Sequence, residues 1–283
     1  MSELVISASD VKNLRDQTGA GMMDCKKALI EAEGDFEKAV EVLRKQGQKL
    51  SVKRADREAK EGAVIALVSH NKNKGIVVRL SCETDFVAKN DGFVELTKQI
   101  AEIALKETPA TIDDLLNCSF DGKISIAEKI NEYLAAIGEK IELVSYESIS
   151  TNAGEGQVLS YVHAGNRAGV IVALNLEGPQ YEEAGRNVAM QVAAMKPLAL
   201  DKDGVDASIV EKEIEIGKEQ ARAEGKPEAM LEKIALGKLN KFYQENTLNS
   251  QTYVKDGKMS VAEYLQSLHE DLKVTAFKHV ALG

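Results

Sequence analysis

An internal duplication constrains the fold of this chain more than any other feature of its sequence. When the chain is laid over itself at a shift of 94 residues, Gly62 falls on Gly156 and Gly75 falls on Gly169. The apolar residues Val64, Val68, Ile76, Val78 and Leu80 fall on Val158, Val162, Val170, Val172 and Leu174 at the same shift. In each copy the apolar residues alternate over two short runs, which is the pattern of two paired β-strands. The chain is therefore expected to build one supersecondary unit twice.

A helix is expected after each predicted hairpin, because apolar residues recur there at helical spacing. These residues are Phe93, Leu96, Ile100 and Ile103 in the first copy and Ala184, Val188, Val192 and Met195 in the second. Each copy then ends in one more run with strand character, residues 141–149 and 274–282. We predict an α+β fold whose duplicated core has two small antiparallel sheets with helices packed on them.

A second block of the repeat shows that the second copy carries an insertion. Asp121, Gly122, Lys123, Ser125, Ala127 and Glu128 recur as Asp256, Gly257, Lys258, Ser260, Ala262 and Glu263, at a shift of 135 residues. Since 135 minus 94 is 41, an insertion of 41 residues lies between the two blocks. Strong helix formers fill residues 207–224 and 227–245, on either side of the breakers Gly225 and Pro227. The insertion is predicted to be an antiparallel helical hairpin.

The first fifty residues are predicted to form three short helices. Ser9 can cap a first helix that stops at Gly19, and Asp24 can cap a second that ends at Gly34. Asp35 then caps a third. Apolar residues at helical spacing give this module a small core of its own. We expect the module to be tethered to the rest of the chain rather than fused with it.

These elements divide the chain into consecutive parts. The predicted parts are a three-helix module (1–47), a linker or exposed helix (48–61), a first core repeat (62–150), a second core repeat (151–206 and 246–283) and the inserted hairpin (207–245). The second part is read as a linker because its composition is charged and poor in apolar residues.

Composition and charge narrow the classes of function. The chain is 44% hydrophobic and 29% charged, which is usual for a globular protein, and its formal charge of −9 argues against a general nucleic-acid binder. It has no apolar run long enough to span a membrane, and residues 1–10 lack the basic-then-apolar order of a secretion signal. A cytoplasmic protein with a protein partner is expected. Cys25, Cys82 and Cys118 are widely spaced, so reduced structural thiols are expected rather than a disulfide framework or a zinc site.

The sequence offers little enzyme chemistry. Gly19, Ala20 and Gly21 begin like a dinucleotide fingerprint, but Asp24 stands where the pattern needs a third glycine, and no strand precedes the run. The sequence has no P-loop, and its four histidines lie far apart without an HExxH pair. We predict neither catalytic residues nor a metal or other cofactor.

The segment from Thr84 to Val87 is a candidate contact site between a predicted strand and the next helix. One interpretation is a helix cap followed by a buried Phe86. The other is an acid beside an aromatic ring at a loop tip, which enters a crevice of a partner. The equivalent residues of the second copy are Gly178, Pro179, Gln180 and Tyr181. Because the shared fold does not require an Asp-Phe pair there, the second interpretation is favoured.

Two further features are candidate contacts. Met22 and Met23 lie at the start of the predicted second helix, where they form either half-buried filler or a soft apolar patch that adapts to a partner. His163 lies at a strand end of the second copy, where it is either solvated or a polar contact on a second partner surface.

The chain contains two long, well-separated motifs. The first is the run Thr18, Gly19, Ala20, Gly21, Met22, Met23, Asp24, Cys25, Lys26, Lys27, Ala28 and Leu29, and the second is Thr84, Asp85, Phe86 and Val87. Both resemble motifs of the elongation factor Ts family. The likeness continues through Tyr161, Val162, His163, Gly169 and Val170, and through the predicted hairpin and residues 248–254. It covers nearly the whole chain, and two long motifs in the expected order are far more specific than a short glycine pattern.

The resemblance implies a guanine nucleotide exchange factor of protein biosynthesis. It implies binding to the GDP form of elongation factor Tu, faster release of GDP, and dissociation when GTP arrives. The residues that it assigns to partner binding are Arg15, Met22 and Met23 for a grip on the GTPase domain, Thr84, Asp85, Phe86 and Val87 for dislocation of the partner's magnesium, and His163 for another domain.

Two other classes of function remain as alternatives. A non-catalytic adaptor would use the three-helix module, which is similar to ubiquitin-associated domains, and would bind a partner without nucleotide exchange. An enzyme with an unrecognised site would turn over a small molecule. Contact of the predicted hairpin with the partner, and self-association of the protein through it, are two alternatives that the sequence leaves open.

Overall fold

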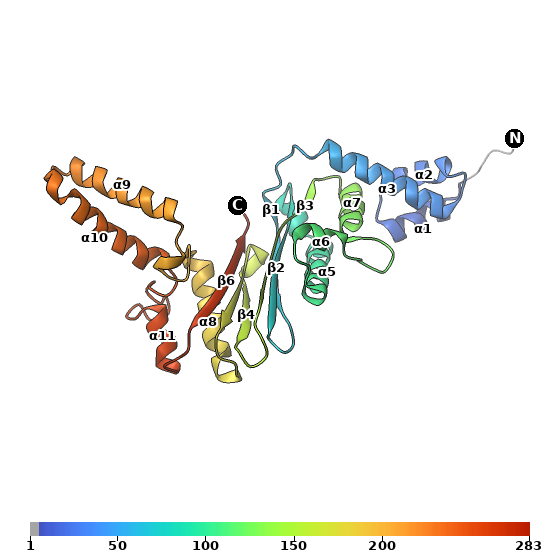
Figure 1. Cartoon of the computed structure of the whole chain (residues 1–283). Coiled ribbons are helices and arrows are strands. Elements are labelled where there is room, and N and C mark those ends of the chain that lie inside the picture. The colour runs from blue at the N-terminus through green and yellow to red at the C-terminus, as the bar shows by residue number, and fades with distance from the viewer. Residues whose placement is uncertain (1–5) are drawn as a thin grey trace.

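The computed structural model describes residues 6–283 and confirms the predicted α+β fold with two small sheets (Figure 1). Each sheet has three antiparallel strands, in the order β1-β2-β3 and β4-β5-β6. The strands are β1 (Glu61–Val68), β2 (Lys74–Cys82), β3 (Ile141–Ser150), β4 (Gln157–Val162), β5 (Ala168–Leu174) and β6 (Val274–Ala281). Both copies share this order, because each hairpin is followed by helices and then by a third strand beside its second strand.

The two sheets pack face to face through one apolar layer. The buried residues of this layer are Val64, Ala66, Val77, Ile149, Val158, Ile171, Ala173 and Val280. A Cβ atom added to Gly75 would lie 2.6 Å from Cγ1 of Val158, and one added to Gly169 would lie 2.9 Å from Cγ1 of Val64. Two of the repeated glycines therefore permit the close approach of the sheets.

Helices cover the outer face of each sheet and complete two separate cores (Figure 1). They are α5 (Asp91–Glu107), α6 (Ile112–Asn117) and α7 (Ile126–Ile137) on the first sheet, and α8 (Glu182–Met195) and α11 (Val261–Leu268) on the second. The predicted apolar residues of α5 and α8 are largely buried. Met195 differs and is 46% exposed, because it lies in the last turn of α8.

The N-terminal module consists of α1 (Ala8–Thr18), α2 (Met22–Glu31) and α3 (Phe36–Lys53) around its own core. Two of the predicted caps are wrong. Ser7, not Ser9, caps α1, because its side chain and that of Asp10 exchange hydrogen bonds with each other's backbone in a capping box. Gly21 precedes α2, and Asp24 lies in the first turn of that helix, where a carboxylate is favoured by the helix dipole. The caps at Gly19 and Asp35 are confirmed.

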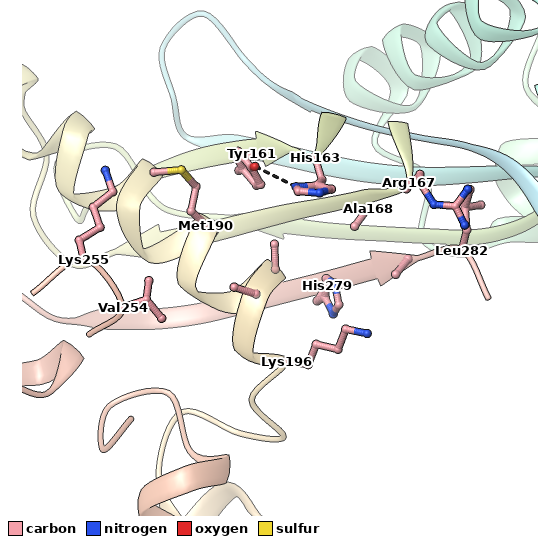
Figure 2. A pocket seen from close by; sticks show the side chains of 13 residues that line it. Tyr161, His163, Arg167, Ala168, Met190, Lys196, Val254, Lys255, His279 and Leu282 are labelled. Atoms are coloured by element: carbon pink, nitrogen blue, oxygen red, sulfur yellow. Dashed lines mark hydrogen bonds between the residues drawn. The ribbon is translucent and has the colours of Figure 1, made fainter. Parts of the chain in front are cut away.

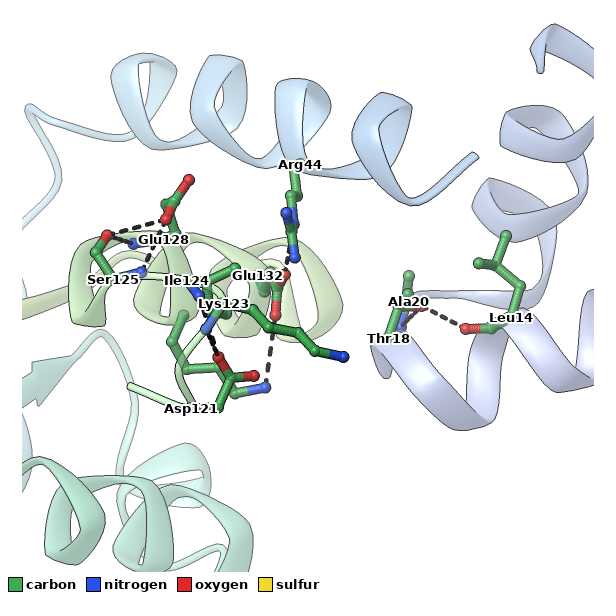
Figure 3. A network of polar contacts seen from close by, with 11 residues as sticks. Leu14, Thr18, Ala20, Arg44, Asp121, Lys123, Ile124, Ser125, Glu128 and Glu132 are labelled. Carbon is green, nitrogen blue, oxygen red and sulfur yellow. Dashed lines mark hydrogen bonds and ion pairs between the residues drawn. The ribbon is translucent and has the colours of Figure 1, made fainter. Parts of the chain in front are cut away.

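The module contacts the first repeat, so the expectation that it is only tethered is wrong. Helix α3 continues to Lys53 and packs against α7. A Cβ atom added to Gly47 would lie 2.8 Å from the backbone oxygen of Asn131, and Arg44 Nε lies 3.0 Å from Glu132 Oε1 (Figure 3). The glycine allows the two helices to approach closely, which a pattern of apolar residues does not reveal.

The insertion forms an antiparallel helical pair that projects at the opposite end of the molecule from the N-terminal module (Figure 1). Its helices are α9 (Ala207–Ala223) and α10 (Glu228–Asn246). Short 3₁₀ turns lie outside the insertion, at η1 (Ala164–Asn166), η2 (Pro179–Tyr181) and η3 (Lys202–Gly204). Gly217 lets the pair approach, since an added Cβ atom would lie 3.1 Å from the Cα of Ala235. No helix within residues 6–283 combines the length and the apolar character needed to cross a membrane.

Candidate functional site

The segment predicted as a loop tip is instead a single helical turn, α4 (Asp85–Ala88), which together with Thr84 we call the Phe86 turn (residues 84–88). Thr84 caps the turn, because its Oγ1 accepts a hydrogen bond from the backbone N of Val87 at 3.4 Å. The same hydroxyl donates to Glu139 Oε1 at 2.8 Å, and the backbone N of Thr84 donates to Glu139 Oε2 at 3.1 Å. The polar groups of Thr84 are thus used inside the fold.

Phe86 points away from the protein while its neighbour anchors the turn. The side chain of Phe86 is 84% exposed, whereas Val87 is buried in the first core. The interpretation with a buried Phe86 is therefore wrong. In the second copy Tyr181, the equivalent of Val87, is buried too, and Gln180 occupies the exposed position. The duplicated fold needs the buried anchor and does not need an aromatic ring beside it.

Asp85 supplies a negative charge next to the exposed ring. Its carboxylate is half-exposed and accepts a hydrogen bond from Lys89 Nζ, with Oδ2 at 2.7 Å. This hydrogen bond and the charge of Lys89 lower the pKa of Asp85 below its ordinary value. An ionised carboxylate and an exposed aromatic ring are therefore presented side by side on a turn that is fixed at both ends.

The strand that leads into this turn ends in a buried thiol. Burial, with added repulsion from Glu139 and Glu61, raises the pKa of Cys82 to about 12, and its Sγ donates to the backbone oxygen of Thr84 at 3.2 Å. Burial also raises the pKa of Cys25 and of the half-buried Cys118. All three cysteines are free thiols in the structure.

Alkylation with iodoacetamide at pH 8 is expected to reach Cys118 first and to spare Cys82. A thiol with a pKa of about 12 has roughly one thiolate in ten thousand at this pH, and the thiolate is the reactive form. Mass spectrometry of the labelled peptides measures the order. Guanidinium chloride should make all three thiols react alike, and labelling of Cys82 in the folded protein as fast as Cys118 would contradict the expectation.

The predicted grip residues lie on the surface of the N-terminal module. Arg15 is exposed in the last turn of α1, and Met22 and Met23 are 48% and 63% exposed in the first turn of α2. Neither methionine belongs to the core of the module. In the connection between α1 and α2, the backbone N of Ala20 donates to Thr18 Oγ1 at 3.3 Å, and this hydroxyl donates to the backbone oxygen of Leu14 within α1 at 2.7 Å (Figure 3). The two methionines therefore form an exposed apolar patch at the start of α2.

His163 lies in a groove of about 480 Å³, the His163 groove (Figure 2). Its Nδ1 shares a hydrogen bond with the hydroxyl of Tyr161 at 3.0 Å. Basic and apolar side chains line the groove. Among the described residues, no Asp or Glu belongs to its lining. The basic members are His163, Arg167, Lys196, Lys255 and His279. Burial, and then the charge of Lys196, lower the pKa of His279. The groove joins α8 and β6, which are distant in sequence, so no local sequence pattern indicates it.

The structure links the candidate segments in two ways. Glu61 opens β1, pairs in register with Cys82 just before the Phe86 turn, and lies 3.6 Å from Arg167 of the His163 groove. Helix α7 provides the other link, because Ala20 of the module shares a small hollow with Ala135, and Glu139, two residues after α7, binds Thr84. Within residues 6–283 there is no group of three or more His, Cys, Asp or Glu side chains arranged to hold a metal ion.

Comparison with known proteins gives the family. A profile described as "Elongation factor TS" matches residues 83–283. Elongation factor Ts of Christiangramia forsetii is 50% identical over 278 residues, which is 98% of this chain and 99% of that protein. Elongation factor Ts of Cytophaga hutchinsonii is 51% identical over 279 residues, with 98% and 99% covered. That of Porphyromonas gingivalis is 42% identical over 280 residues, with 99% of both chains covered. The chain therefore belongs to the elongation factor Ts family of translation elongation factors.

Proposed function

We propose that this protein is the guanine nucleotide exchange factor of elongation factor Tu. It binds elongation factor Tu in the GDP form in the cytoplasm, speeds the release of GDP, and dissociates when GTP binds. It carries no nucleotide or cofactor of its own and catalyses no chemical reaction. The observation that carries the proposal is the exposed Phe86 beside an ionised Asp85, on a turn whose other residues are occupied by the fold.

Asp85 and Phe86 act at the nucleotide site of the partner. The ring enters a crevice near the bound nucleotide, and the carboxylate disturbs the charges that hold the magnesium ion and the phosphates. Thr84 and Val87 support the same step by holding the turn in place, because Thr84 is hydrogen-bonded to Glu139 and Val87 is buried. Exposed aromatic side chains of this kind often dominate the energy of an interface.

The other candidate residues hold the partner in place. Arg15, Met22 and Met23 bind the GTPase domain, for which an exposed charge beside a soft apolar patch is suited. His163, in its basic groove, contacts another domain of elongation factor Tu. Contacts made mainly with the nucleotide-poor form lower the free energy needed to empty the site.

Equilibrium binding tests the proposal through its reciprocity. The affinity of the fluorescently labelled protein is measured for elongation factor Tu that is nucleotide-free, GDP-bound or GTP-bound. We expect the tightest binding to nucleotide-free elongation factor Tu. Each nucleotide should lower the affinity of the protein for elongation factor Tu by the same factor by which the protein lowers the affinity of that nucleotide. Equal affinity for all three forms would rule out exchange and would leave an adaptor that binds without acting.

Replacing both Met22 and Met23 by alanine is expected to weaken binding to elongation factor Tu without lowering the maximal rate of GDP release. Each exposed anchor is worth about 1 kcal/mol or more, so the concentration for half-maximal GDP release should rise about tenfold or more, with the maximal rate retained. This pair is preferable to deletion of the module, because deletion uncovers the face of α7 on which α3 packs. Ile30→Ala, which removes another exposed side chain of α2, is the matched control. A fall in the maximal rate would contradict the division of roles.

A further inference from the structure

Glu83 joins three segments of the chain at the base of the Phe86 turn. Its side chain is only 18% exposed, and its oxygens lie 3.1 Å from Arg54 Nη1, 2.9 Å from Arg57 Nη1 and 2.5 Å from the backbone N of Lys140. Burial alone would raise the pKa of Glu83, but these hydrogen bonds outweigh it and lower the pKa. The two arginines follow α3, and Lys140 precedes β3. One carboxylate thus connects the turn to the segment that carries the N-terminal module.

Glu139 completes a reciprocal arrangement between the same two stretches of chain. Glu83 accepts from the backbone of Lys140, while Glu139, the residue before it, accepts from the backbone N and the hydroxyl of Thr84. In each stretch, one residue supplies the accepting carboxylate and its neighbour supplies the donating backbone N–H, so hydrogen bonds run in both directions between the two stretches. Bonds to an ionised acceptor are stronger than bonds between neutral groups. We call Glu83 and Glu139 the carboxylate clamp.

The second copy holds the start of its equivalent turn (residues 178–182) through an uncharged side chain, while Glu182 at the end of that turn pairs with Lys72 and Arg186. Glu177 is the residue equivalent to Glu83, and it is exposed and takes part in no ion pair within the described residues. The turn is held there by Gln157, whose amide bonds the backbone N and the backbone oxygen of Gly178 at 3.2 and 3.1 Å. The start of the turn can therefore be fixed by a neutral side chain. The clamp is confined to the copy that presents Phe86.

We propose that Glu83 and Glu139 are positioning residues that hold the Phe86 turn in its active orientation and tie it to the N-terminal module. The inference rests on the proposed function. Phe86 stands on a one-turn helix and is 84% exposed, so packing around its ring does not fix its direction. Its direction is fixed at the ends of the turn, by Thr84 on the clamp and by Val87 in the core. Loosening the clamp leaves the contact residues present but misdirected.

Kinetics of GDP release from elongation factor Tu separate positioning from binding. The variants are Glu83→Gln and Glu139→Gln, which keep the shape and remove the charge. We expect the maximal release rate to fall about tenfold or more, since small misplacements are costly, while the half-maximal concentration changes less than about threefold. Glu182→Gln is the matched control, because Glu182 is also partly buried and pairs with two cations, Lys72 and Arg186, away from the turn. An unchanged maximal rate in the clamp variants, or an equal fall in the control, would overturn the inference.

A second measurement does not depend on the partner. Hydrogen exchange at the backbone amides of residues 87–89 should be about tenfold or more faster in the clamp variants than in the control. If the wild-type protein does not speed the release of GDP from elongation factor Tu, while hydrogen exchange is faster in the clamp variants, the proposed function fails and the clamp stands. Unchanged exchange would overturn the clamp whatever the kinetics show. Should Glu83→Gln not fold, Thr84→Ser and Thr84→Val serve instead, and the serine variant, which keeps the hydroxyl, should show the slower exchange and the faster GDP release of the two.

Discussion

Replacing both Asp85 and Phe86 by alanine is expected to remove most of the acceleration of GDP release while leaving the protein folded. An exposed aromatic anchor contributes about 2–4 kcal/mol to an interface, which corresponds to about 30- to 700-fold in rate if the contact forms only as the nucleotide leaves. Phe86 is 84% exposed, so its loss should change the free energy of unfolding by no more than about 0.5 kcal/mol.

Stopped-flow release of labelled GDP measures the effect at saturating concentrations of the variant. Gln180→Ala is the matched control, since Gln180 holds the equivalent exposed position in the second copy. We expect the control to behave as the wild type and the double variant still to bind elongation factor Tu through the N-terminal module. If the double variant releases GDP as fast as the wild type, the turn is not the element that opens the nucleotide site.

Replacing Gly62 or Gly156 by alanine is expected to have the largest effect on stability. Gly62 has a φ of +152° and Gly156 a φ of +126°, which residues with a side chain rarely adopt. An added Cβ atom would lie 2.2 Å from the backbone oxygen of Leu80 in the first copy, and 1.9 Å from that of Leu174 in the second. These oxygens belong to the paired strand and cannot move without breaking the sheet. Each substitution should cost about 3 kcal/mol or more, or prevent folding.

Urea unfolding of the two variants measures these costs. Gly237→Ala is the control, because Gly237 lies in α10 with no atom within 4 Å of an added Cβ, and alanine there should stabilise the protein by about 0.5–1 kcal/mol. Similar losses at Gly62 and Gly156 are expected because the duplication places both in one role. A loss under about 1 kcal/mol at either position would show that the strands adapt and that the repeated glycines are not required.

Much of the fold could be predicted because the same supersecondary unit occurs twice in the sequence. Repeated apolar alternation predicted the sheets, and the change in shift from 94 to 135 residues predicted the inserted hairpin, now seen as α9 and α10. The caps at Ser9 and Asp24 were wrong because several polar residues near a helix start can serve, and the choice depends on local geometry. The contact of α3 with α7 depends on Gly47, which carries no apolar signal.

The candidate site was predictable only where one segment carries it. The exposed Phe86 could be inferred because the second copy has glutamine at that position. The carboxylate clamp could not, since Glu83 and Glu139 are 56 positions apart and acidic residues are common in this chain. The His163 groove escaped for the same reason, because its walls come from segments that only the tertiary structure brings together.

The most direct test of nucleotide exchange by this protein is the rate at which labelled GDP leaves elongation factor Tu, measured with and without the wild-type protein. We predict that the rate rises with the concentration of the protein and saturates at about a hundred times the spontaneous rate or more, as expected for a strong coupling between two binding sites. A rate that stays at its spontaneous value at every concentration, although the two proteins bind, would show that the protein is not an exchange factor.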